Sequence, residues 1–237
     1  MQAPALAHPT RLPLRAPQGR EVDVWLIRYS ADDFDPADFE ASGIPRPPAI
    51  CRSVPHRQAE YLHGRRAARH ALQILGVPVH NVPTGAHRQP IWPAGVVGSI
   101  THSRSLAAAV AARLGPLQAI GIDVEGVAEG SSLQALLEVA IDDAELALLR
   151  QIAPALELAA LVTLVFSAKE SFFKAAYAEV GRYFDFTAVK VTAVDVGHGH
   201  LTLELREPLS AVLVPGVVRH ASFAFLAEEI LFTACLW

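Results

Sequence analysis

The amino-acid sequence predicts a mixed α+β fold. Two long helical patterns, residues 56–75 and 154–180, lie among shorter segments rich in β-branched side chains, and three β-like segments close the chain. About half of the 237 residues are apolar and 19% are charged, a composition typical of a folded protein. At this length the chain forms either one large domain or two smaller ones.

The N-terminal part begins with twenty residues that contain four prolines and three arginines but no continuous apolar stretch. We therefore expect residues 1–20 to be a flexible segment and not a secretory signal. Residues 21–29 alternate valine and leucine with other side chains and predict a strand. The Asp- and Pro-rich stretch 32–48 predicts a loop.

Residues 56–75 predict a helix that ends at the Gly-Val-Pro sequence 76–78. Leucines and alanines suit its buried side, and basic residues occupy the rest of the cylinder. These basic residues are Arg57, Arg65, Arg66 and Arg69. They form either a solvated face or an anion site, and this segment alone does not decide between the two.

A glycine-containing segment follows at 95–103 (GVVGSITHS). Its glycines permit close approach of the backbone, and Ser99, Thr101 and His102 supply short polar groups suited to phosphate oxygens. The same pattern also suits a plain turn that leads into a strand. Residues 106–113 predict a buried strand or a short helix, which periodicity does not distinguish.

Residues 119–125 (AIGIDVE) predict a strand with Gly121, Asp123 and Glu125 on one face and apolar side chains on the other. The two carboxylates, about 7 Å apart along the strand, repel each other unless a cation lies between or beside them. Hard oxygen ligands of this kind suit Mg²⁺. The alternative is a strand end that reaches solvent, where two acids cost little.

Two helices are predicted next. Asp142, with Glu145 three residues later, is a capping-box pattern that opens a helix to about Ile152. Pro154 suits the first position of the following helix, which should end at Gly181.

The second of these helices contains the segment 166–174 (FSAKESFFK). At a period of 3.6 residues, Glu170 shares one stripe with three aromatic residues, and we expect the helix to bury that stripe. The aromatic residues are Phe166, Phe173 and Tyr177. A buried carboxylate needs a partner, either Lys174 one turn later or a metal ion that other carboxylates also bind.

The chain closes with β-like segments at 187–196, 201–206 and 221–237, the last long enough for two strands. The sequence GHGH at 197–200 predicts a hairpin connection between the first two. Its histidines suit a polar turn better than a metal site.

Composition excludes several classes of protein. A net charge of -4 and a pI near 6.2 disfavour a general nucleic-acid binder. No apolar run reaches the length of a membrane span. Cys51 and Cys235 match no metal-binding or redox spacing, so we expect reduced thiols in a cytoplasmic protein.

The order of these motifs resembles the Sfp-type 4′-phosphopantetheinyl transferases, and most of all the branch that includes the enterobactin-synthase activators. The resemblance rests on a basic helix, then GSITHS at 98–103, IGIDVE at 120–125 and FSAKESFFK at 166–174. It covers residues 50–180, with weaker similarity at either end. Phe166 stands where many relatives have tryptophan, and Ser103 stands where the enterobactin type often has cysteine. Neither change removes a candidate metal ligand or phosphate donor.

The resemblance implies two similar α/β subdomains related by a pseudo-twofold axis, with the active site in the cleft between them. We expect the subdomains to span 21–117 and 118–237, after the flexible segment 1–20. The implied reaction transfers 4′-phosphopantetheine from coenzyme A to a serine of an apo acyl or peptidyl carrier protein and releases adenosine 3′,5′-bisphosphate. Mg²⁺ is the expected cofactor, with Mn²⁺ as an acceptable substitute, and a monomer is the expected state.

The same resemblance assigns roles to individual residues. Asp123, Glu125 and Glu170 match the carboxylates that hold Mg²⁺ against the pyrophosphate of coenzyme A. Lys174 matches the lysine that contacts the leaving phosphate, and Glu170 is the expected base, either directly or through a metal-bound water. The residues expected to bind phosphates of coenzyme A are Arg57, Arg65, Arg88, Thr101 and His102.

Two rival functions would use the same residues. A metal-dependent phosphohydrolase or nuclease could use three carboxylates, although a nuclease should carry a basic surface. A non-catalytic module that binds carrier or coenzyme A would leave the full carboxylate set and Lys174 without a purpose. The transferase ranks first.

Overall fold

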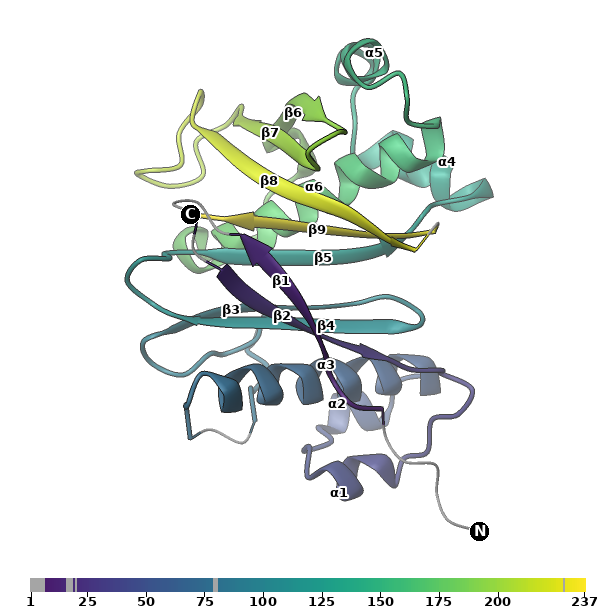
Figure 1. Cartoon of the computed structure of the whole chain (residues 1–237), viewed down its shortest axis with the longest axis vertical. Helices are drawn as coiled ribbons and strands as arrows, with labels where there is room; N and C mark the ends of the chain where they lie inside the picture. Colours follow the sequence, from purple (N-terminus) through teal and green to yellow (C-terminus); the bar gives the residue numbers. More distant parts are fainter. Residues whose placement is uncertain (1–6, 16–18, 20, 79–80, 228) are drawn as a thin grey trace. The chain divides into compact units, whose positions relative to one another are not determined.

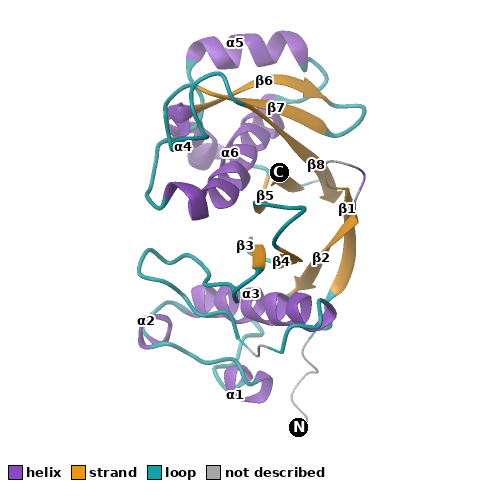
Figure 2. Ribbon diagram, turned by 90° about the vertical axis from the view of Figure 1, so that its left-hand side faces the viewer, coloured by secondary structure: helices purple, strands orange, loops and turns teal. Residues whose placement is uncertain are grey.

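The computed structural model describes residues 7–15, 19, 21–78, 81–227 and 229–237. The chain divides into two compact units, Met1–Gln118 and Ala119–Trp237, and each contains one antiparallel sheet and its own helices (Figures 1 and 2). The mixed α/β fold class is therefore confirmed. The pseudo-twofold relation expected from the family stays a prediction.

The first unit is built on a four-stranded sheet in the order β1-β2-β4-β3. Its strands are β1 (Thr10–Arg15), β2 (Glu21–Arg28), β3 (Val96–His102) and β4 (Leu106–Arg113). The long helix α3 (Pro55–Ile74) packs on β4, β2 and β3. Small side chains on β4 permit this close packing, since Ala109 and Ala111 lie in one buried cluster with Ala67 and Ala68 of α3.

Two expectations for this unit were wrong. Residues 10–15 of the segment expected to be flexible form the edge strand β1, which pairs antiparallel with β2 and brings Arg11 Nε within 2.7 Å of Asp23 Oδ1. An edge strand tolerates Pro13 because one side of it needs no ladder bonds. The expected loop 32–48 contains the short helix α1 (Asp38–Ser42), and α2 (Pro48–Cys51) begins at its end.

The second unit has a five-stranded sheet in the order β5-β9-β8-β7-β6. Its strands are β5 (Ile120–Gly126), β6 (Val189–Asp195), β7 (His200–Leu205), β8 (Val218–Ala227) and β9 (Ile230–Leu236). The expected hairpin joins β6 to β7, and the last expected segment forms the two strands β8 and β9.

The helices of this unit are α4 (Gly130–Val139), α5 (Asp143–Ile152) and α6 (Leu158–Val180). The predicted cap of α5 is confirmed, because Asp142 Oδ1 accepts from Glu145 N at 2.8 Å. The predicted end of α6 is confirmed as well, since Gly181 adopts a left-handed φ of 69°. Its start was wrong: residues 154–156 form the turn from α5, and the helix begins at Leu158.

Helix α6 packs on β5 and β9 through a different side from the one expected. Its buried side includes Leu164, Val165, Ala168 and Phe172, whereas the aromatic stripe with Glu170 is only half-buried. The helix is apolar around most of its circumference, so periodicity alone could not select the buried side. Packing selects it at Gly121, where an added Cβ would lie 1.8 Å from the carbonyl oxygen of Ser171.

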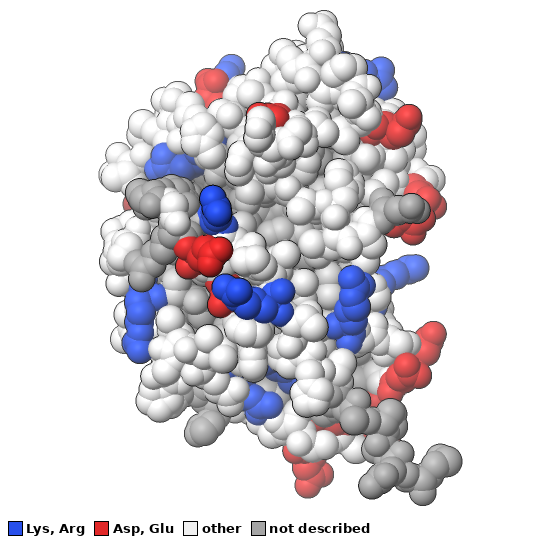
Figure 3. All heavy atoms as spheres, in the orientation of Figure 1, with Lys and Arg blue, Asp and Glu red and all other residues white. Residues whose placement is uncertain are grey.

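The surface charges are mixed in sign. On the face drawn in Figure 3, acidic and basic side chains lie interspersed over the described parts of both units. Among the residues that the structure describes, no helix has the length and apolarity needed to cross a bilayer.

Candidate active site

Asp123 is the most buried of the candidate site residues in the second unit, with an exposed fraction of 2%. It lies on β5 opposite Thr233 of β9, under helix α6. Its Oδ2 accepts a hydrogen bond from Ser167 Oγ at 2.8 Å, and its Oδ1 contacts Lys174 Nζ at 2.5 Å. Both donors come from α6, so the close packing at Gly121 also brings the donors to the carboxylate.

Glu170 lies between these two donors on the helix and is partly open, with 28% of its side chain exposed. Its Oε2 is 4.0 Å from Lys174 Nζ. Burial raises the pKa of Glu170 above its ordinary value, Lys174 opposes the shift and Asp123 adds to it.

Lys174 therefore serves several carboxylates at once. Burial by itself would lower the pKa of Lys174, but the negative charges of Asp123, Glu170 and Glu125 outweigh it and raise that pKa. The four predicted residues of this unit thus form one electrostatic group, in which Asp123, Glu170 and Glu125 act on the ammonium group of Lys174.

The donor chemistry of this group fits Mg²⁺, because all three acids offer hard oxygen ligands. The positions of these three acids do not by themselves form a metal site. Within the described ranges, no three His, Cys, Asp or Glu side chains gather closely enough to form a metal-binding group. In this arrangement Lys174 Nζ supplies the positive charge beside Asp123 and Glu170.

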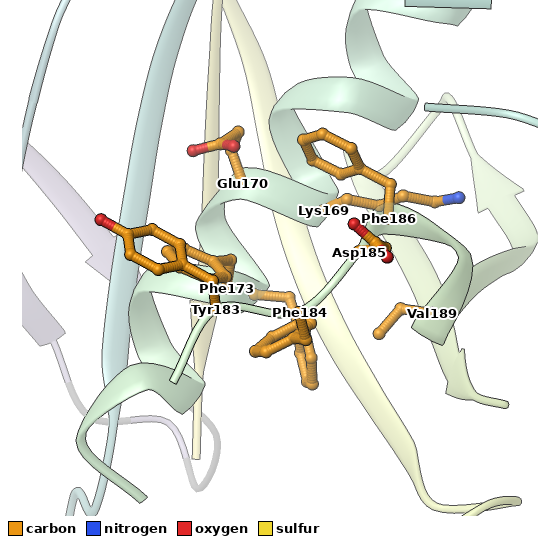
Figure 4. Close-up of a pocket in the computed structure, with 9 residues that line it drawn as sticks. Lys169, Glu170, Phe173, Tyr183, Phe184, Asp185, Phe186 and Val189 are labelled. Carbon is orange, nitrogen blue, oxygen red and sulfur yellow. The ribbon is translucent and has the colours of Figure 1, made fainter. Parts of the chain in front are cut away.

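A pocket of about 280 Å³ lies beside Glu170. Its walls are mainly aromatic, with Phe172, Phe173, Tyr183, Phe184 and Phe186 among the lining residues. Figure 4 shows the carboxylate of Glu170 and the amine of Lys169 pointing in opposite directions from α6. Only the Glu170 side of the helix thus belongs to the electrostatic group around Lys174.

Lys169 forms a buried ion pair that the sequence did not reveal. Its Nζ lies 2.8 Å from Glu145 Oε2 and donates to the carbonyl of Ala140 at 2.7 Å, and the two charged side chains are 3% and 2% exposed. Glu145 Oε1 accepts from Val191 N at 2.7 Å. Ser167 was missed too, although its spacing from Glu170 and Lys174 (i, i+3, i+7) places all three on one helical side.

In the first unit the structure brings Arg57 and His102 together. Arg57 NH1 lies 2.6 Å from His102 Nε2 and donates to Glu60 Oε2 at 2.8 Å. His56 also contacts Glu60, at 3.0 Å. The start of α3 and the end of β3 thus form a half-exposed basic cluster around one glutamate.

The other phosphate-binding candidates occupy different environments. Thr101 is buried whereas the next residue, His102, is half-exposed, because neighbouring side chains on a strand point to opposite faces. Arg65 is also buried, with its guanidinium 4.8 Å from the ring of Tyr61 and its NH2 donating to Thr84 Oγ1 at 2.7 Å. Burial lowers the pKa of Arg65, while Tyr61 raises it and Arg57 lowers it further. Arg88 is exposed on a turn with a left-handed φ of 66°.

Comparison with known families gives two adjacent matches. Residues 46–112 match the 4′-phosphopantetheinyl transferase N-terminal domain, and residues 119–222 match the 4′-phosphopantetheinyl transferase superfamily. Enterobactin synthase component D of Salmonella typhimurium is 36% identical over 191 residues, which cover 79% of this chain and 77% of that protein. The chain belongs to the 4′-phosphopantetheinyl transferase superfamily.

Further relatives of this transferase agree. Enterobactin synthase component D of Escherichia coli strain K12 is 40% identical over 147 residues, covering 60% of the chain and 68% of the relative. The 4′-phosphopantetheinyl transferase Svp of Streptomyces mobaraensis is 34% identical over 195 residues, which cover 82% of this chain and 75% of that protein. The chain is accordingly an enzyme that transfers 4′-phosphopantetheine from coenzyme A to a carrier protein.

Proposed function

We propose that the transfer takes place at Asp123, Glu125, Glu170 and Lys174 and depends on Mg²⁺. The observation that carries this proposal is that three carboxylates, those of Asp123, Glu170 and Glu125, act on Lys174 in a place that is partly open to solvent. Three carboxylates offer the hard oxygen ligands that Mg²⁺ prefers in proteins. Asp123, Glu125 and Glu170 would hold the ion after their side chains move closer together than they lie in this structure, and the bound ion would supply charge neutralisation at the pyrophosphate.

The residues then divide the reaction between them. The hydroxyl oxygen of the carrier serine attacks the phosphorus that carries the pantetheine arm, and the bond from this phosphorus to the bridging oxygen breaks. Glu170, partly open beside the pocket, accepts the serine proton. Adenosine 3′,5′-bisphosphate leaves with the electron pair, and Lys174 stabilises the charge that develops on it.

The aromatic pocket beside Glu170 suits the pantetheine arm of coenzyme A. This arm is slender, its gem-dimethyl and methylene groups can contact aromatic rings, and it is joined directly to the reacting phosphate. A walled pocket next to the proposed base would orient it, which lowers the entropic cost of reaching the transition state. Replacement of Phe173 by alanine should raise the KM for coenzyme A more than it lowers kcat.

Arg57 and His102 are the proposed contacts of the 3′-phosphate of coenzyme A. They lie together at the half-exposed start of α3, unlike Arg65 and Arg88. Arg57→Ala should raise the KM for coenzyme A more than the KM for its 3′-dephospho analogue. Arg113→Ala is the control, since Arg113 is exposed and pairs with Val96 at the far end of β3 from His102. Equal effects of Arg57→Ala on the two substrates would remove Arg57 from this site.

Transfer to carriers can be tested directly. The pure protein is incubated with coenzyme A, Mg²⁺ and a panel of apo acyl and peptidyl carrier proteins, and the carriers are weighed by mass spectrometry. We expect a mass gain of one phosphopantetheine that EDTA abolishes and that Mg²⁺ or Mn²⁺ restores. No mass gain on any carrier would overturn the proposal. If the mass gain persisted in EDTA, the proposed metal dependence would be overturned, but transfer to carriers would stand.

The relatives named enterobactin synthase component D point to siderophore assembly, so peptidyl carriers from such pathways belong in the panel. We also propose that the enzyme acts as a monomer in the cytoplasm. Analytical ultracentrifugation tests the monomer at the concentrations used for the assay.

A further inference from the structure

Ser167 is a buried polar residue whose side chain contacts a proposed metal ligand. It lies on α6 one turn before Glu170 and is fully buried. Its Oγ is 2.8 Å from Asp123 Oδ2 and 2.9 Å from Thr233 Oγ1. Thr233, also fully buried, donates to the carbonyl oxygen of Ser167 at 2.8 Å.

The directions of these hydrogen bonds follow from counting hydrogens. An ionised carboxylate only accepts, and each hydroxyl carries one hydrogen. The hydrogen of Ser167 therefore points to Asp123 Oδ2. The hydrogen of Thr233 points to the carbonyl oxygen of Ser167, which ties β9 to the same turn of α6.

The two donors on α6 hold the two oxygens of Asp123 in different directions. Ser167, which is fully buried, donates to Oδ2. Lys174, seven residues later and partly exposed, contacts Oδ1. Rotation of the carboxylate about its Cβ–Cγ bond would break both contacts. Oδ1 is thereby directed toward the group that contains Lys174 and Glu170.

We propose that Ser167 is a positioning residue that orients the carboxylate of Asp123 for binding of the divalent cation. This inference rests on the proposed function, because it takes Asp123 to be a metal ligand. Hydrogen bonds from outer residues to metal ligands change metal affinity or activity by roughly 10- to 100-fold when removed. The hydroxyl of Ser167 is in the place where such a bond acts on Asp123.

A structural role for Ser167 would look different, and the same helix provides the control. Ser171, four residues later, is also fully buried, but its Oγ donates to the backbone, to Ala168 O at 2.9 Å. Ser167→Ala and Ser171→Ala thus delete the same atom from the same helix at the same burial. They differ in whether that atom touches the side chains of Asp123 and Thr233 or a backbone carbonyl.

The test measures metal binding as well as turnover. Mn²⁺ binding to the wild type, Ser167→Ala, Ser171→Ala and Asp123→Ala is titrated by electron paramagnetic resonance without coenzyme A, and transfer is measured over a range of Mg²⁺ concentrations. We expect Ser167→Ala to weaken Mn²⁺ binding by roughly 10-fold or more and to raise the Mg²⁺ concentration for half-maximal transfer in parallel. Ser171→Ala should stay within about twofold of the wild type.

Ser167→Thr keeps the hydroxyl and should recover most of the lost affinity, and it serves as the second variant where alanine impairs folding. Equal Mn²⁺ affinity in Ser167→Ala and Ser171→Ala would overturn the positioning role and leave the proposed function standing. A wild type that transfers phosphopantetheine but binds no Mn²⁺ would overturn the metal site itself, and with it the role of Ser167.

Discussion

Helix α6 carries two lysines five residues apart, and each contacts a carboxylate in a different environment. Lys169 and Glu145 form a sealed pair whose side chains are 3% and 2% exposed. Lys174 is 25% exposed and lies among Asp123, Glu125 and Glu170. One helix thus holds a closed ion pair and an open group of charges.

The two lysines differ in how their charge is balanced. Burial lowers the pKa of Lys169, and Glu145 raises it in compensation. Each oxygen of Glu145 already has a donor, Lys169 on one side and Val191 N on the other. The pKa of Lys174 is raised instead, since three carboxylates act on it. A sealed pair serves the structure, whereas a partly open group of three carboxylates can offer oxygen ligands to a cation.

The largest effect should come from the open group. Glu170→Gln keeps the shape of the side chain but removes the charge and the proposed base, so transfer should fall roughly 10³-fold with the free energy of unfolding little changed. The rate is measured by carrier mass shift and the stability by urea unfolding. Glu179→Gln, an exposed change on the same helix, is the control. Retention of transfer within tenfold would show that Glu170 is neither base nor essential ligand.

Lys174→Met should lower transfer by about 10²-fold, the effect expected when one stabilising charge is removed from a transition state. It also removes a positive charge from beside Asp123 and Glu170, so the variant should lose stability. Added Mg²⁺ should restore much of that loss, because an ion that binds only the folded state stabilises it. Thermal unfolding with and without Mg²⁺ measures this. A loss of stability that Mg²⁺ leaves unchanged would contradict the idea that the ion and Lys174 serve the same carboxylates.

Lys169→Met tests the sealed pair by stability. It leaves Glu145 charged and buried without its cation, which typically costs about 3–5 kcal/mol. The double variant Lys169→Met with Glu145→Leu replaces the pair by apolar side chains and should recover most of the free energy of unfolding, with transfer near that of the wild type. Urea unfolding of the three proteins gives the comparison. If the double variant were as stable as the wild type but had lost transfer, Lys169 or Glu145 would have to take part in the reaction.

The smallest effect concerns the cap of α5, the helix that carries Glu145. Asp142→Ala removes the bond from Glu145 N and should cost about 1 kcal/mol at pH 7. Asp143→Ala, one residue later, is the control and should cost less. Hydrogen bonds from Lys190 and from the backbone of Glu145 lower the pKa of Asp142. Its contribution is therefore present above pH 4 and should disappear as pH falls below about 4. A cost that does not change with pH would exclude the charged cap.

Much of the second unit could be predicted because local chemistry dictated it. Asp142 caps a helix whatever surrounds it, and Gly181 ends one because a left-handed residue is needed there. The strand at β5 followed from the alternation of Ile120 to Glu125. The edge strand β1 could not be predicted from its own residues, since its stability comes from pairing with β2.

The sequence by itself determined which acids and lysines the chain offers, their spacing, and the family to which that spacing points. Only the tertiary structure decided which acid each lysine contacts. Local spacing favoured Glu170 for Lys174, but the distance to Glu170 is 4.0 Å and the distance to Asp123 is 2.5 Å. The reason is that Gly121 lets α6 lie directly on β5, and this close packing brings Lys174 and Ser167 of the helix to Asp123 of the strand.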